Sequence, residues 1–350
     1  MMINLGTAAL STALMVTPLP TTELQQEVDA VVAAGATSAT VEISGDGRPV
    51  RASSGAAVAG TNRPVPHNAR FRIGSETKTF LATVVLQLVD EGRLNLDDKV
   101  ERVLPGVVHD DRITVRQLLN HSSGLHEVLA TMPSPRSEEF LAIRWKTWTT
   151  EELVARATAY PVDFVPGSQV VYNNTGYLVL GLIVEKLTGH SYGDEIKHRI
   201  IQPLKLKSTS LPGTNPFIPG PHARGYLPLE RGLVDITEVN PSILNAAGEM
   251  ISTTRDLNRF FQALLDGELL SADLTRELQS TARESKYGLG VISRKLPCGT
   301  AWGKDGDAPG YSTWTFVAPD NHRSVTVSVT WGAGNHKAAV NALLDKELCR

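Results

Sequence analysis

Apolar residues in the first ninety positions predict a helix, two strands and a second helix. In residues 24–34 the apolar side chains recur at helical spacing and form one face. Residues 40–43 and 50–52 look like strands on either side of Gly45-Asp46-Gly47, which predicts a hairpin. Residues 71–73 are expected to continue this sheet. A longer helical face follows, closed by Gly92 and formed by Phe80, Leu81, Val84, Val85, Leu88 and Val89.

From residue 93 to 250 the pattern is mainly helical and often interrupted. Helices are predicted to start at Ile113 and near Thr150, where Thr149 or Thr150 is a suitable N-cap. An apolar helix over 177–187 is closed by Gly189. The proline-rich residues 211–221 predict an irregular loop.

The last hundred residues return to a helix and then to strands. The pattern predicts a helix over 256–265, strands over 287–294, 301–304, 312–318 and 324–331, and a closing helix over 338–348. The two ends of the chain therefore supply a sheet with helices, and the middle supplies a helical insertion. This predicts an α/β (α+β) fold in which an antiparallel sheet is flanked by helices.

We expect a single domain over residues 22–350, made of two lobes. An α/β lobe contains residues 22–75 and 250–350, and a mainly helical lobe contains residues 76–249. The junction of the lobes falls at Ser75. A cleft between two such lobes is a usual place for a ligand site.

Composition excludes several classes of partner. The net charge is −3 and there is no long basic run, so nothing indicates nucleic acid or an anionic membrane. No apolar run reaches the ~18 residues that span a bilayer. Nine histidines are scattered without His-x-x-x-His or Cys-x-x-Cys spacing, so neither a metal nor another cofactor is expected. We expect a monomer.

The N-terminus and the two cysteines leave the cellular compartment open. Residues 5–16 are apolar like the centre of a signal peptide, but no Lys or Arg precedes them. Residues 1–21 are therefore a signal peptide, a clipped or misassigned start, or a disordered leader. Cys298 and Cys349 are either two buried thiols, compatible with the cytoplasm, or a disulfide, which would indicate an oxidising compartment.

The candidate chemistry begins with Ser75 and Lys78, which form the single Ser-x-x-Lys of the chain. Residues three apart share a helix face, so the amine can approach the hydroxyl. A helix N-terminus also favours negative charge that develops at the same place. This is the layout of a serine nucleophile activated by lysine. The simpler interpretation of an isolated pair is a helix cap and a solvated lysine.

Two further stretches fit a serine hydrolase. Tyr172 and Asn174 form the one Tyr-x-Asn of the chain; the phenol can relay a proton once a nearby ammonium lowers its pKa, and the amide can hold a substrate. Lys304 follows Gly303 on a predicted strand and can face a cleft. A core tyrosine, a turn asparagine and a strand-end lysine are the alternatives. For His121, near a predicted helix end, a structural role is the better interpretation.

The order of these motifs resembles the serine β-lactamase and penicillin-binding-protein superfamily, in its class C-like branch, and most closely its secreted actinomycete DD-carboxypeptidase/transpeptidase type. The similarity begins near residue 22 and runs to the C-terminus. It is carried by residues 71–80, 86–92, 110–117, 185–191, 218–227 and 287–290.

This resemblance implies a role for each matching residue. Ser75 would be the acylated nucleophile, Lys78 its base and Tyr172 a proton relay to the leaving group. Asn174 would hold the substrate amide, and Lys304 would complete the catalytic set. The backbone N–H groups of Ser75 and Asp307 would form the oxyanion hole, which is worth about 3 kcal/mol per donor. The resemblance also implies that Cys298 and Cys349 form a disulfide and that the chain is exported.

The sequence departs from the carboxypeptidase pattern at the wall that binds a terminal carboxylate. Ile292, Asp305 and Asp307 stand where an arginine and two threonines are expected, around Gly306, and Lys304 replaces a histidine. Glu249 and Glu76 replace small or neutral residues, and Ile243 replaces an aromatic one. We hypothesise that these acids repel a carboxylate and favour a neutral or cationic leaving group. Alternatively, the acids face solvent or pair with Lys304 and Arg294.

The sequence thus predicts a serine acyl-enzyme hydrolase of the penicillin-binding type that acts on a small peptide, amide or ester. β-Lactams are candidate covalent ligands. A true D-Ala-D-Ala carboxypeptidase, an acyltransferase of secondary metabolism and a non-catalytic penicillin sensor are the alternatives.

Overall fold

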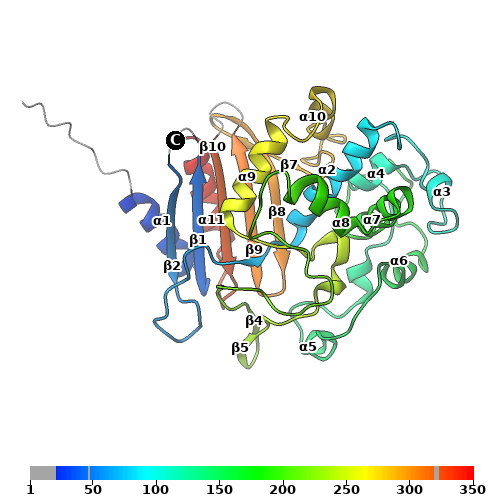
Figure 1. Ribbon diagram of the computed structural model, residues 1–350. Helices are drawn as coiled ribbons and strands as arrows, with labels where there is room; N and C mark the ends of the chain where they lie inside the picture. The colour runs from blue at the N-terminus through cyan, green and yellow to red at the C-terminus, as the bar shows by residue number, and fades with distance from the viewer. Residues whose placement is uncertain (1–20, 46–47, 319–322) are drawn as a thin grey trace, which may run out of the picture.

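A six-stranded antiparallel sheet joins the two ends of the chain. The structure, a computed structural model, describes residues 21–45, 48–318 and 323–350. The strands lie in the order β2-β1-β10-β9-β8-β7, so β1 pairs with β10 although the two are far apart in sequence (Figure 1). Their bounds are β1 Ser38–Ser44, β2 Val50–Gly55, β7 Ile292–Leu296, β8 Gly299–Ala308, β9 Tyr311–Ala318 and β10 Arg323–Thr330.

Helices cover both faces of the sheet. Helices α1 (Thr21–Ala33) and α11 (Lys337–Leu348) pack together on one face, against a core that includes Val325, Val327 and Val329 of β10. Helix α9 (Thr254–Leu265) crosses the other face, with α10 (Ala272–Leu278) after it. The alternation of valine with serine and threonine in β10 therefore does not mark a solvated face, because α9 buries the polar side as well.

The middle of the chain folds into a mainly helical part whose centre is α2 (Thr77–Asp90). This helix is buried on nearly all sides, and its Phe80 ring stacks on Phe260 of α9 with the centroids 3.6 Å apart. Around it lie α3 Val100–Val103, α4 Val115–Leu119, α5 Glu138–Ile143, α6 Thr150–Thr158, α7 Thr175–Thr188 and α8 Tyr192–Ile196. Shorter turns of helix are η1 Gly74–Glu76, η2 Val128–Thr131, η3 Lys197–Ile201, η4 Pro241–Ile243 and η5 Asn245–Ala247.

Local signals place most helix ends correctly. Thr149 caps α6 through a capping box with Glu152, and Gly189 ends α7 in the left-handed region with φ of 78°. The predicted helices over 113–119, 177–187, 256–265 and 338–348 correspond to α4, α7, α9 and α11 within a few residues. Residues 211–221 contain no helix or strand, as expected.

Two strand predictions are wrong. Residues Phe71–Arg72 (β3) do not join the main sheet but pair with β6 (Ile251–Ser252), and a separate hairpin joins β4 (Tyr226–Leu229) to β5 (Gly232–Asp235). The strand predicted over 287–294 begins only at Ile292, because the chain turns at Gly290, whose φ is 89°. Tyr287 lies before the strand, is joined to Ile292 by a single β-bridge, and lines the cleft.

Residues 1–20 and positions 46 and 47 of the predicted hairpin turn lie outside the described residues. Within the described ranges, every helix is too short or too polar to cross a bilayer, and three metal-ligating side chains never gather at one place.

Candidate active site

Ser75 lies at the N-terminal end of α2, directly against strand β8. Two glycines permit this close packing. Gly74 has φ of 52°, and a Cβ there would meet the carbonyl oxygen of Asp307 at 2.4 Å. A Cβ on Gly306 would lie 2.0 Å from the carbonyl oxygen of Ile73 and 3.0 Å from the Ser75 nitrogen. The contact therefore brings the backbone of residues 306–307 beside Ser75.

Lys78 lies one turn farther along and is fully buried. Its Nζ is 3.1 Å from Ser75 Oγ, 2.7 Å from Asn174 Oδ1 and 2.6 Å from the carbonyl oxygen of Ala247. Burial, helped by the positive charge of Lys304, lowers the pKa of Lys78 well below its ordinary value, although Glu127 and Asp305 oppose the shift. This environment favours the neutral amine.

The contacts of Lys78 suit that neutral amine. An uncharged amine has two N–H donors and one lone pair, and the two carbonyl oxygens of Asn174 and Ala247 can only accept hydrogen bonds. A charged amine would donate to Ser75 Oγ as its third contact; in the neutral amine that same position holds the lone pair, which can accept from the Ser75 hydroxyl. The arrangement is that of a base prepared to take the proton of a serine nucleophile.

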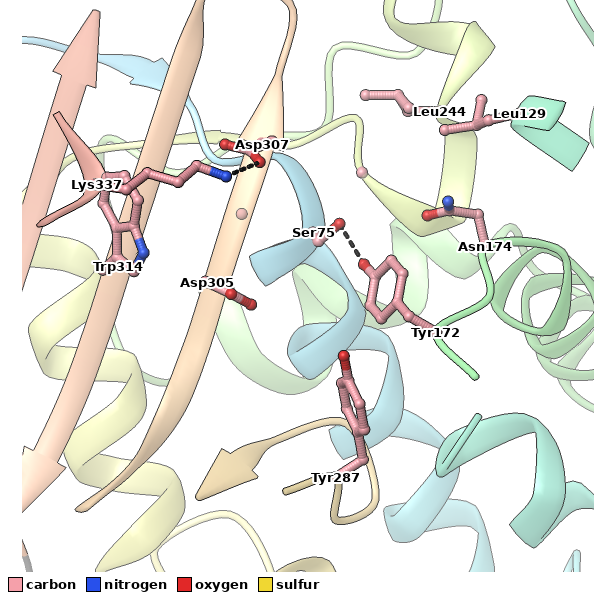
Figure 2. A pocket seen from close by; sticks show the side chains of 12 residues that line it. Ser75, Leu129, Tyr172, Asn174, Leu244, Tyr287, Asp305, Asp307, Trp314 and Lys337 are labelled. Atoms are coloured by element: carbon pink, nitrogen blue, oxygen red, sulfur yellow. Dashed lines mark hydrogen bonds and ion pairs between the residues drawn. The ribbon is translucent and has the colours of Figure 1, made fainter. Parts of the chain in front are cut away.

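Tyr172 supplies a second partner for the nucleophile. Its phenol donates to Ser75 Oγ at 2.5 Å, and Figure 2 shows the ring directed toward Ser75 from the opposite side of the cleft. Burial raises the pKa of Tyr172 to about 12, despite the opposing effect of Lys304. The expectation that an ammonium lowers this pKa is therefore wrong, because desolvation is the larger effect. Tyr172 is a neutral phenol that can give a proton to a leaving group.

Lys304 and Asp305 form an ion pair on β8. Lys304 Nζ is 2.7 Å from Asp305 Oδ1 and 2.9 Å from the carbonyl oxygen of the same residue, and 5.3 Å from the centre of the Tyr172 ring. Burial disfavours the charge on Lys304, but Asp305 more than offsets it and raises the pKa above its ordinary value. Burial likewise works against the Asp305 charge, yet Lys304 lowers the pKa of Asp305 to about 2.

A second acid and lysine lie farther along the same wall. Asp307 Oδ2 is 3.7 Å from Lys337 Nζ at the start of α11, and its other oxygen accepts from Ser312. Trp331 donates to that same serine at 2.8 Å. The wall thus carries two carboxylates, each beside a lysine. One alternative stated above was that the acids pair with Lys304 and Arg294. Asp305 does pair with Lys304, whereas Arg294 pairs with Asp345 on α11.

Three residues expected at this wall lie elsewhere. Glu249 is buried at a separate cavity of about 480 Å³, where it accepts from Tyr192 at 2.5 Å and from the Gly213 nitrogen at 2.9 Å. Burial raises its pKa to about 7. Ile292 packs in the core between the sheet and α11, since its side chain leaves the opposite face of β7. Glu76 is buried under β9, where it accepts from Thr315 at 3.2 Å and burial raises its pKa.

The cleft itself has a volume of about 390 Å³. Figure 2 shows Ser75 at its centre, with the paired acids on one side and two leucines on the other. It is lined by Ser75, Leu129, Tyr172, Asn174, Leu244, Gly248, Tyr287, Asp305, Gly306, Asp307, Trp314 and Lys337. The structure thus brings Lys78 and Tyr172 to the Ser75 hydroxyl, with Asn174 against Lys78 and Lys304 over the Tyr172 ring.

Several participants carried no signal in the sequence. The carbonyl of Ala247, the ring of Tyr287 and the amine of Lys337 reach the cleft from distant segments. Glu127 accepts hydrogen bonds from Asn174 and lies six residues after His121. His121 packs behind Tyr172 with the ring centroids 4.5 Å apart; burial lowers its pKa well below the ordinary value, and its Nδ1 accepts from the Asn173 nitrogen at 3.2 Å.

Two solved amide hydrolases are similar to this protein over nearly the whole chain. A D-stereospecific amidohydrolase from Streptomyces sp. is 38% identical, with a TM-score of 0.85 over 94% of this chain and 98% of its own. The D-amino acid amidase from Ochrobactrum anthropi SV3 is 30% identical, with a TM-score of 0.82 over 93% and 97%.

Curated relatives include penicillin-binding proteins. Penicillin-binding protein 4 of Amycolatopsis lactamdurans is 31% identical over 71% of this chain, and penicillin-binding protein 4* of Bacillus subtilis is 29% identical over 75%. This chain spans 65% and 61% of their respective lengths. The Beta-lactamase family matches residues 24–350. With the fold and the predicted motifs in agreement over this range, the chain belongs to the Beta-lactamase family.

Proposed function

We propose that this protein is a serine amidohydrolase that works through an acyl-Ser75 intermediate. The observation that carries the proposal is the lysine amine held between two carbonyl oxygens and the Ser75 hydroxyl. Ser75 Oγ attacks the carbonyl carbon of an amide while its proton passes to Lys78 Nζ. The backbone N–H groups of Ser75 and Asp307 would stabilise the oxyanion.

The remaining steps complete the turnover. Tyr172 gives its phenolic proton to the leaving nitrogen, the C–N bond breaks, and the amine departs. The proton held by Lys78 returns to the Tyr172 oxygen, which restores both groups. Water then attacks the ester carbonyl and gives a proton to Lys78 Nζ. The bond from the carbonyl carbon to Ser75 Oγ breaks, Lys78 returns the proton to Oγ, and the acid product leaves. The 2.5 Å contact between Tyr172 and Ser75 supports this short route for protons.

We infer that the substrates carry a D-configured amino-acid residue and an uncharged or cationic leaving group. Similarity to two D-specific amide hydrolases supports the first part. The two ion pairs of β8 support the second part. Lys304 and Lys337 already face Asp305 and Asp307, so a substrate carboxylate would have to compete with these aspartates for the lysines. We assign Asp305, Gly306 and Asp307 to substrate contact at this wall.

Hydrolysis of matched amides tests the proposal. We expect the purified protein to release ammonia from D-phenylalanine amide at least about tenfold faster than from L-phenylalanine amide. Release of D-Ala from acyl-D-Ala-D-Ala should be slower still. Ser75→Ala should abolish all turnover and the mass increase caused by a fluorophosphonate, while Ser122→Ala, a buried serine away from the cleft, should retain both.

The alternative outcomes of that experiment are distinct. Equal labelling of Ser75→Ala and the wild type would overturn the acyl-enzyme proposal. Faster release of D-Ala from the free acid would favour a carboxypeptidase, the second candidate, which the 31% identity to a penicillin-binding protein supports. Products joined to an added amine would indicate acyl transfer.

We also propose that the chain acts outside the cytoplasm with a disulfide between Cys298 and Cys349. The two residues lie in the β7–β8 turn and after α11, with Cα atoms 5.6 Å apart and a separation of 51 positions in sequence. Closing a loop of this size restricts the unfolded chain.

Loss of this disulfide should lower the free energy of unfolding by about 2–4 kcal/mol. The measurement is thermal or denaturant unfolding of the wild type with and without reductant, beside Cys298→Ser/Cys349→Ser. The reductant should have no effect on the double variant. Two titratable thiols in protein purified without reductant would contradict the bond.

A further inference from the structure

Glu127 lies beside the catalytic cluster, just before η2, and its carboxylate is fully engaged by N–H groups. Glu127 Oε2 accepts from the backbone nitrogen of Asn174 at 2.6 Å, and Oε1 accepts from Asn174 Nδ2 at 2.9 Å. Oε1 also accepts from the Leu129 nitrogen at 3.0 Å. Glu127 thus binds the backbone and the side chain of one catalytic residue at once.

These contacts define which way the Asn174 amide faces. Its Nδ2 donates to the carboxylate, so its Oδ1 is turned toward Lys78 Nζ, 2.7 Å away. The reverse orientation would place an oxygen against Glu127 Oε1 and an NH₂ group against the amine. The first of those contacts is repulsive, because an ionised carboxylate can only accept, and the second would take up the lone pair of the neutral amine.

The orientation matters because it determines where the lysine lone pair lies. With Asn174 Oδ1 and the Ala247 carbonyl as two acceptors, both N–H bonds of the neutral amine are used. The lone pair then faces Ser75. With an amide NH₂ in place of Oδ1, the lone pair would turn to that donor and away from the serine.

We propose that Glu127 is a positioning residue that fixes the amide of Asn174 and, through it, directs the lone pair of Lys78 at Ser75. The inference rests on the proposed acyl-enzyme function and adds a residue that does not touch the reacting atoms. Glu127 also places a negative charge near Lys78 that raises the pKa of the amine, against the larger lowering by burial and by Lys304. The two effects of Glu127 can be separated by experiment.

The central experiment is a double-mutant cycle between Glu127→Gln and Asn174→Ala. Glutamine has the same shape but must present an NH₂ to an N–H of Asn174 or Leu129, so the amide loses its fixed orientation. We expect kcat/KM on D-phenylalanine amide to fall about 10²-fold at its pH plateau. In the Asn174→Ala background the same change should cost less than about threefold, because Glu127 acts through the missing amide.

The pH profile separates positioning from loss of packing. The working form of Lys78 is the neutral amine, so kcat/KM rises as pH rises through the pKa of Lys78. Removing the Glu127 charge should shift this rise to lower pH in both backgrounds, since the charge acts through space. Glu127→Asp keeps the charge, so its rise should stay in place while its plateau is intermediate. Glu151→Gln, on the exposed first turn of α6, should match the wild type.

Three outcomes for Glu127→Gln would overturn the inference. They are a plateau of kcat/KM within threefold of the wild type, a double variant whose loss in kcat/KM is the product of the losses of the two single variants, or an unshifted pH profile. If Glu127→Gln does not fold, the cycle with Glu127→Asp applies the coupling part of the test, and a plateau within threefold of the wild type or full multiplication would still overturn the inference. Fluorophosphonate labelling of Ser75 in the wild type is measured in parallel. Its absence would refute the proposed function itself, whereas labelling without the predicted coupling would refute only the role of Glu127.

Discussion

Replacing Lys78 with methionine should lower kcat/KM by about 10³–10⁴-fold. Methionine fills a similar volume but has no amine, so nothing takes the proton of Ser75, and general-base catalysis is worth about this factor. The carbonyl oxygens of Asn174 and Ala247 would each lose a donor, which costs about 1–3 kcal/mol of stability per buried group. The variant should therefore be less stable but folded at 25 °C.

The measurement is kcat/KM on D-phenylalanine amide from pH 5 to 10, with unfolding followed by circular dichroism. In the wild type the rate should rise through the lowered pKa of Lys78, well below the 10.5 of a free lysine. The residual rate of the methionine variant should lack this rise. A variant that keeps more than a tenth of the activity, or the same pH rise, would mean that another group takes the proton.

Gly306→Ala should lower kcat by about 10²–10³-fold while KM changes little. The added methyl group would lie 2.0 Å from the carbonyl oxygen of Ile73, so β8 must move away from the start of α2. Asp307 would move with it, and its backbone N–H, which we propose as an oxyanion donor, would no longer be in place. Loss of one such donor has an effect of this size because it acts on the transition state.

Gly193→Ala is the matched control, since a methyl group on α8 would meet only ordinary contacts of 3.5 Å or more. We expect it to leave kcat and stability nearly unchanged. Pre-steady-state acylation of Ser75 distinguishes a lost oxyanion donor from general misfolding, which unfolding curves report. A Gly306→Ala enzyme with normal acylation would show that the donor lies elsewhere.

The sequence predicts the part of the site that depends on local geometry. Ser75 and Lys78 share one helix face, so their contact follows from a spacing of three residues. Tyr172 and Asn174 lie just before α7, and only the order of the motifs brought them to the same cleft. The sheet was predictable for a similar reason, because β8, β9 and β10 follow one another closely in sequence.

What the sequence could not give depends on strand register and on long-range packing. Strand β7 begins only at Ile292, which pairs with Gly303, and the Ile292 side chain packs in the core. A change of one residue in register exchanges the two faces of a strand. The partner of Glu249 is Tyr192, on a helix fifty-seven residues away, so no local pattern could assign it.

The pKa of Tyr172 lies above the expected value for a related reason. Charges can be counted in a sequence, and a nearby lysine was expected to lower the pKa of the phenol. Burial cannot be counted in this way, since it arises from the packing of segments far apart, and here it dominates. The prediction of excess negative charge at the wall failed similarly, because Lys337 reaches Asp307 from the last helix.

The pairing of β1 with β10 bears on how the protein is made. Ser38 contacts Thr330 across 292 positions of sequence, so the sheet cannot close until nearly the whole chain has left the ribosome. Strand β8, which supports Ser75, is also synthesised late. Ser75 and Lys78 are thus synthesised early, and strand β8 on the other side of the cleft is added only with the last fifty residues. A nascent or truncated chain is therefore inactive, and such long-range closure makes folding slow relative to a helical protein.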